Sequence, residues 1–158
     1  MFAEMRLAVG ISKSADILEH IYSLPSPDQE TAMDKIRHIE RTAMSSQSPQ
    51  PGLVALMAYL ESKSIPKGIC TRNFEMPVAH LLTKFLSGKE FWPIVTRDFR
   101  PPKPDPAGIL HIAKSWGFVK SAESGQGDAS QLIMVGDSID DMTAGHRAGA
   151  VKIGRAHV

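Results

Sequence analysis

The sequence has a single cysteine, Cys70, so no disulfide can form within the chain. A disulfide-stapled secreted scaffold is thereby excluded, and a reducing cytosol is compatible with this composition. The chain also lacks an excess of either charge, since it has 18 Lys and Arg and 17 Asp and Glu, with both signs interspersed. Proteins that bind nucleic acid or anionic membranes usually carry a basic patch. We therefore expect a small-molecule partner, no nucleic acid and no membrane, with the oligomeric state left open.

Long apolar runs are absent as well. Glu4, Arg6 and Lys13 interrupt the amino-terminal stretch, which lacks the apolar core of about 7 to 15 residues found in signal peptides. The sequence also has no apolar span of about 18 residues that could form a transmembrane helix. We expect a cytoplasmic protein. Its 158 residues, 42% of them hydrophobic, are enough to bury an ordinary globular core.

The pattern of the sequence changes near residue 48. Residues 1–46 show helical periodicity and no strand-like run, which predicts a small helical lobe over residues 1–48. Within this lobe, Ser26 and Pro27 are typical of a helix N-cap and first helical position, and the helix they open should end near Ser45. The polar stretch SSQSPQPG, residues 45–52, has the turn composition of a boundary.

Residues 49–153 alternate between helical segments and short apolar strands. Strands are predicted at GICT, PIVT and LIMV, which are residues 68–71, 93–96 and 132–135. This alternation predicts an α/β fold, a Rossmann-like parallel sheet with flanking helices. Ligands of such sheets bind at the carboxyl ends of the strands.

The strongest chemical signal is GDSIDD, residues 136–141. Asp137 should project from the end of the LIMV strand, and Asp141 lies about one helical turn further on. Mg²⁺ typically takes one or two protein carboxylates and completes its shell with water and phosphate oxygens, so this acidic pair fits a magnesium site. The alternative is that Ser138 caps a helix and the acids complement its dipole. We accept that alternative for Asp140 and favour a functional role for Asp137.

Two further polar residues follow predicted strands. Lys103 lies in FRPPKPDP, where prolines restrict the backbone and would fix its ammonium as a charge for a phosphoryl group. Thr71 ends GICT and is followed by Arg72 and Asn73. Its hydroxyl and the next backbone N–H could both donate to a phosphate oxygen. Taken singly, Lys103 is more typical of an exposed turn residue, and Thr71 is more typical of a turn or capping residue.

The order Thr71, Lys103, then Asp137 with Asp141, one motif in each βα unit, resembles the haloacid dehalogenase-like hydrolases. The resemblance covers residues 50–153 directly, and the helical lobe resembles the cap of phosphoglycolate phosphatase-like members. It implies a Mg²⁺-dependent phosphatase acting on a small phosphorylated metabolite through a phosphoaspartyl intermediate.

The resemblance also implies a role for each matching residue. Thr71 would bind the phosphoryl group together with Arg72 and Asn73, and Lys103 would neutralise charge between the nucleophile and the phosphate. Asp137 would ligate the metal. Asp141 would orient a metal-bound water or Lys103.

One family motif is missing from the sequence. Members of the family attack phosphate with the first Asp of a D-x-D-x-T/V motif that ends their first strand, and neither Asp16 nor Asp28 lies in such a segment. The resemblance implies that this strand would lie between the strands ending at Thr71 and Val135. We expect the chain to be a fragment without turnover of its own.

The last six residues of the sequence, Ile153–Val158, have a separate interpretation. ATC GGA AGA GCA CAC GTC encodes them and resembles the start of a widely used sequencing adapter, so we expect residues 154–158, together with Ile153, to be a non-native tail.

Two alternatives for the function stay open. One is a noncatalytic phosphate- or metal-binding protein of the same fold, and the other is a phosphomutase on the same core.

Overall fold

The computed structural model describes residues 2–12 and 15–154, in two compact units, Met1–Pro51 and Gly52–Val158. The sequence indicates a boundary a few residues earlier, after residue 48. Residues 155–158 of the expected non-native tail lie outside the described residues. None of the described helices has the length and apolar character needed to span a bilayer.

The amino-terminal unit is helical, as the periodicity of its sequence predicts. Its helices are α1 (Phe2–Val9), α2 (Ile17–Ser23) and α3 (Ser26–Ser45). Helix α3 buries Ile36. The predicted cap of α3 is wrong by one residue, because Pro25 is the N-cap and Ser26 already belongs to the helix. Asp16 caps α2, where its carboxylate accepts the N–H groups of Leu18 and Glu19.

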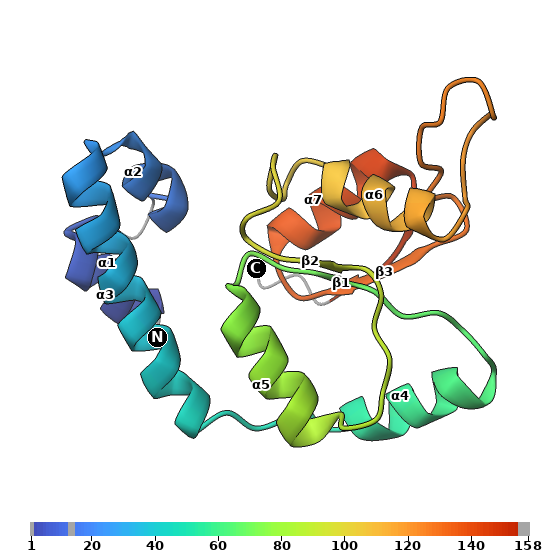
Figure 1. Cartoon of the computed structure of the whole chain (residues 1–158), viewed down its shortest axis with the longest axis horizontal. Coiled ribbons are helices and arrows are strands. Elements are labelled where there is room, and N and C mark those ends of the chain that lie inside the picture. Colours follow the sequence, from blue (N-terminus) through green and yellow to red (C-terminus); the bar gives the residue numbers. More distant parts are fainter. Residues whose placement is uncertain (1, 13–14, 155–158) are drawn as a thin grey trace. The chain divides into compact units, whose positions relative to one another are not determined.

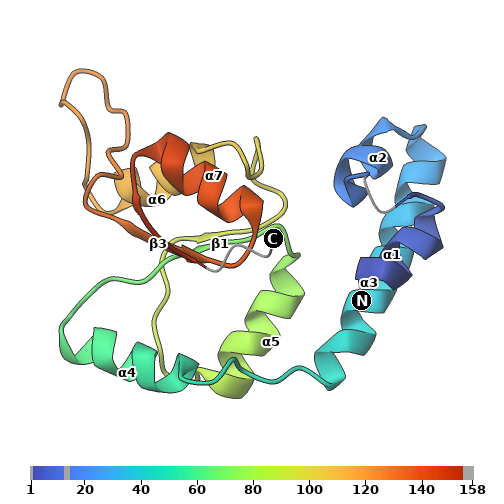
Figure 2. The same ribbon diagram turned by 180° about the vertical axis from the view of Figure 1, so that it is seen from behind.

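The second unit alternates helices and strands (Figure 1). Its elements are α4 (Leu53–Ser62), β1 (Ile69–Cys70), α5 (Glu75–Phe85), β2 (Ile94–Val95), α6 (Ala107–Ser115), β3 (Ile133–Gly136), α7 (Ile139–Ala148) and β4 (Val151–Gly154). In both views α6 and α7 lie on one side of the strands, and α4 and α5 lie on the other (Figures 1 and 2). The predicted α/β fold is confirmed.

The described strands form two separate parallel pairs. Strand β1 pairs with β2, with Ile69 opposite Ile94, and β3 pairs with β4, with Ile133 opposite Val151. Among the described residues no ladder joins one pair to the other. The family resemblance implies a further strand at this junction, and that remains a prediction.

Helices α6 and α7 pack against the strands through one apolar core. The core consists of Val95, Ile109, Ile112, Ala113, Ala129, Leu132, Ala144, Ala148 and Ala150. Helix α7 ends at Gly149, whose φ of 84° is the left-handed conformation that glycine adopts without strain. This packing fixes the carboxyl end of β3 against the first turn of α7.

The β3–β4 pair is covered on one face only. Gly145 of α7 lies so close to Met134 that an added Cβ would come within 3.1 Å of the Met134 Cβ. On the opposite face Ile133 and Val135 are each 61% exposed. Their partners Val151 and Ile153 are each 56% exposed, so Ile153 of the expected tail takes part in this face. Parallel sheets are normally buried on both faces, which makes this an apolar surface without a cover in the described structure.

Candidate active site

The GDSIDD motif forms the turn from β3 into α7. Asp137 follows the strand directly and is exposed. Ser138 is the N-cap of α7, and its hydroxyl accepts the N–H of Asp141 at 3.1 Å. The Asp141 carboxylate in turn accepts the N–H of Ser138 at 3.2 Å, which completes a capping box. The structure therefore shows the capping role considered for Ser138.

Gly136 is required by the position of Asp141. A Cβ at residue 136 would lie 2.5 Å from the Asp141 Cβ and 2.6 Å from its Oδ2. Asp141 is 7% exposed, so its side chain has little room to move away. The glycine of the motif thus allows the helix to press a carboxylate against the strand end.

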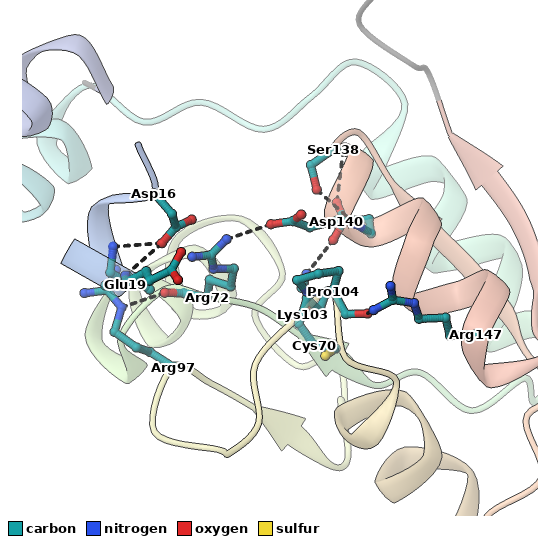
Figure 3. Close-up of polar contacts among 12 residues, drawn as sticks. Asp16, Glu19, Cys70, Arg72, Arg97, Lys103, Pro104, Ser138, Asp140 and Arg147 are labelled. Atoms are coloured by element: carbon teal, nitrogen blue, oxygen red, sulfur yellow. Dashed lines mark hydrogen bonds and ion pairs between the residues drawn. The ribbon is translucent and has the colours of Figure 1, made fainter. Parts of the chain in front are cut away.

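Lys103 bridges the two strand pairs. Its Nζ donates to Asp141 Oδ1 at 2.5 Å and to the carbonyl oxygen of Cys70 at 2.6 Å (Figure 3). The side chains of Lys103 and Asp141 are each only 10% exposed. Of the two partners considered for Asp141, a metal-bound water and Lys103, the structure has the contact with Lys103. The end of β1 and the first turn of α7 therefore meet at one buried ammonium.

The environment of Asp141 keeps its carboxylate charged. Burial alone raises the pKa of Asp141, but the hydrogen bond and charge of Lys103, with the N–H of Ser138, outweigh it. The net result is a pKa below the ordinary value for an aspartic acid. Asp141 is thus a fixed anion that holds Lys103 in place.

Thr71 lies at the end of β1, next to the Cys70 carbonyl that Lys103 binds. Its N–H donates to Val95 on β2 at 2.8 Å, and its Oγ1 accepts the N–H of Asn73 at 3.1 Å. Among the described residues its hydroxyl proton has no acceptor. Thr71 can therefore donate to an oxyanion at this end of the strands.

Two residues to which the sequence assigned no site role contact the segment that follows Thr71. Asp140, interpreted only as an acid complementing the helix dipole, binds the Arg72 guanidinium at 2.6 Å (Figure 3). Arg97, which follows β2, is 6% exposed and donates from Nε to the Arg72 carbonyl oxygen at 2.7 Å. Asn73 is exposed. The pairing of Asp140 with Arg72 spans 68 residues, so no local pattern could have predicted it.

The residues present fit part of a magnesium site. Both oxygens of Asp141 already accept hydrogen bonds, whereas no described group bonds the exposed carboxylate of Asp137. No group of three or more His, Cys, Asp or Glu side chains with metal-binding geometry occurs in the part of the chain that is described. One exposed carboxylate, Asp137, without a bond to another described group matches the sparse protein ligation that Mg²⁺ tolerates.

Comparison with known proteins identifies the family. A profile of haloacid dehalogenase-like hydrolases matches residues 3–149. The chain belongs to this hydrolase family. It is 43% identical over 157 residues to an uncharacterised hydrolase of Saccharomyces cerevisiae, covering 97% of this chain and 68% of that protein. It is 31% identical over 133 residues to a phosphoglycolate phosphatase of Agrobacterium fabrum, covering 83% of this chain and 53% of that protein.

A solved structure supports the same fold. The crystal structure of a hydrolase from Pseudomonas syringae matches with a TM-score of 0.72 at 22% sequence identity, covering 97% of this chain and 73% of that chain. The haloacid dehalogenase-like chain spans between about half and two thirds of the length of the first curated relatives it matches. Membership of the family, predicted from the order of Thr71, Lys103 and Asp137, is confirmed.

Proposed function

We propose that the protein to which this chain belongs is a cytoplasmic Mg²⁺-dependent phosphatase that acts on a small phosphorylated metabolite through a phosphoaspartyl intermediate. The position of Lys103 supports this proposal most strongly. Its bonds to Cys70 and Asp141 bring a buried cation beside the hydroxyl-bearing end of β1 and the acidic turn after β3. The phosphoglycolate phosphatases among the relatives agree with this reaction class.

Each side chain has one task in the proposed reaction. The hydroxyl of Thr71 donates to a phosphoryl oxygen, and Lys103 neutralises the negative charge that accumulates during transfer. Asp141 holds Lys103 in place. Asp137 would hold Mg²⁺, which supplies further charge neutralisation on the phosphoryl oxygens when it is bound.

The attacking carboxylate is proposed to come from an additional strand between β1 and β3. The N–H of Ile69 donates to Pro93 and the N–H of Thr71 donates to Val95, which turns the intervening Cys70 backbone toward the opposite edge. On the other pair, the bond from Val151 to Leu132 likewise turns the Ile133 backbone away from β4. Apart from the Cys70 carbonyl, which accepts from Lys103, both pairs thus offer an open parallel edge. A strand ending in D-x-D-x-T/V would satisfy both edges and bring its first Asp to the same end as Lys103.

Coding sequence upstream of Met1 and an activity assay test this proposal. We expect an apolar strand ending in D-x-D-x-T/V in frame, no turnover of an aryl phosphate by the chain as printed, and Mg²⁺-dependent turnover by the full-length product. An authentic start codon preceded by untranslated sequence would contradict the proposal and favour a noncatalytic binding protein. Isomerised sugar phosphate without net phosphate release would instead identify a phosphomutase.

A further inference from the structure

The loop that carries Thr71 is held by a residue with no role assigned so far. We define this loop as residues 71–74, and Arg97 contacts three consecutive residues of it. Its backbone N–H donates to the Asn73 carbonyl at 3.0 Å, and its Nε donates to the Arg72 carbonyl at 2.7 Å. Its guanidinium carbon lies 3.7 Å from the centroid of the Phe74 ring. A stacked guanidinium with a directed Nε bond is an arrangement that lysine cannot reproduce.

The bond to the Arg72 carbonyl fixes one peptide plane. The peptide unit between Arg72 and Asn73 is planar, and in the trans form its C=O and N–H point in opposite directions. Arg97 binds the C=O of this unit, and the N–H of the same unit donates to Thr71 Oγ1. The orientation of the Thr71 hydroxyl therefore depends on the peptide plane that Arg97 holds.

A second contact of this loop involves a different group. Asp140 binds the guanidinium at the far end of the Arg72 side chain. Several rotatable bonds separate that guanidinium from the backbone, so this ion pair leaves the peptide plane between Arg72 and Asn73 less constrained. Arg97 contacts the plane directly.

We propose that Arg97 is a positioning residue that orients the Thr71 hydroxyl for phosphate, acting through the peptide between Arg72 and Asn73. This inference rests on the proposed function, in which Thr71 binds the phosphoryl group. With Arg97 in place, Thr71 accepts from Asn73 and directs its own proton to the ligand. Without the Nε bond, that peptide can rotate and Thr71 loses its fixed orientation.

A double-mutant cycle tests this dependence, with inorganic phosphate and Mg²⁺ as the probe. Phosphate affinity is measured by ³¹P NMR on the folded chain in sucrose buffer, or on the full-length gene product where the chain does not stay in solution. We expect Arg97→Lys to weaken binding about tenfold, the change that corresponds to one lost charge-assisted hydrogen bond. The matched control Arg37→Lys, on the surface of α3, should leave the affinity unchanged.

The coupling between the two residues decides the outcome. In a Thr71→Val background, Arg97→Lys should have no further effect, because the group it positions is gone. Equal weakening by Arg97→Lys in both backgrounds would overturn the inference, since it would show that Arg97 acts without Thr71. Arg97→Met provides a long apolar side chain without a donor and should behave like Arg97→Lys. Phosphate binding by Arg97→Met at the unsubstituted level would likewise overturn the inference.

Amide exchange separates this inference from the proposed function. Arg97→Lys should accelerate hydrogen exchange at the Asn73 N–H, which bonds Thr71, while Arg37→Lys should not. Accelerated exchange with phosphate binding unaffected by Thr71→Val would support the positioning contact and contradict the phosphate role of Thr71. Unchanged exchange at Asn73 in Arg97→Lys would overturn the inference whatever the affinity.

Discussion

The ammonium nitrogen of Lys103 lies 2.5 Å from Oδ1 of Asp141, a residue 38 positions further along the chain. This bond connects the segment after β2 with the first turn of α7, so it joins two strand pairs that share no ladder in the described structure. Both side chains are nearly buried. The pair therefore supports the local fold as well as the proposed chemistry.

Breaking this pair from the lysine side should be costly. Lys103→Met leaves the Asp141 carboxylate buried without its cation, and we expect the free energy of unfolding to fall by about 3 kcal/mol. Urea unfolding in sucrose buffer measures the change. Arg37→Met, which removes the exposed ion pairs of Arg37 with Glu30 and Asp34 on α3, should cost less than about 1 kcal/mol. Equal effects of the two substitutions would show that the buried pair is no stronger than a surface one.

The same pair should make stability depend on acid pH. The folded-state pKa of Asp141 is lowered, so its contribution is fully present above the unfolded-state pKa and is lost as pH falls through the folded-state value. The loss should thus begin below about pH 4. Unfolding measured from neutral to acid pH without metal should show a shallower acid decline for Asp141→Asn. Superimposable pH slopes of the two proteins would contradict the charged state assigned to Asp141.

Gly136 should not tolerate a methyl group. Its Cβ would meet the Asp141 side chain at 2.5 Å, so Gly136→Ala must displace the carboxylate from Lys103, at an expected cost of about 2 kcal/mol. The comparison is Gly88→Ala, whose Cβ would meet nothing within 4 Å and which carries only the left-handed backbone penalty of about 1 kcal/mol. Thermal unfolding of both variants gives the answer, and a smaller loss at Gly136 than at Gly88 would refute the crowding argument.

The bare face of β3–β4 should limit solubility. We expect the isolated chain to be marginally stable or to aggregate, because an apolar parallel pair with an open edge invites non-native pairing. Val135→Lys places a charge on the exposed face and should reduce light scattering during refolding. Met134→Lys, one residue away on the face packed by α7, should instead prevent folding. A cooperative thermal transition from a soluble unsubstituted monomer would count against this expectation.

The sequence predicted the elements of the site better than the contacts between them. The strand before Asp137 and the cap at Ser138 follow from local composition, and the structure has both of them. The Arg72–Asp140 pair could not be predicted, because the side chains come from separate βα units and only the packed core brings them together. For the same reason Arg97 showed no signal in the sequence, although it contacts the loop that carries Thr71.

We propose that Asp137 and the phosphate-binding residues form part of a phosphatase site. Hydrolysis of an aryl phosphate by the full-length gene product, measured with and without Mg²⁺, tests this most directly. We expect Asp137→Asn to abolish the Mg²⁺-dependent rate while circular dichroism shows an intact fold. Asp128→Asn, in the loop before β3, should retain that rate. Unchanged Mg²⁺-dependent hydrolysis by Asp137→Asn would contradict the metal assignment and with it the proposed function.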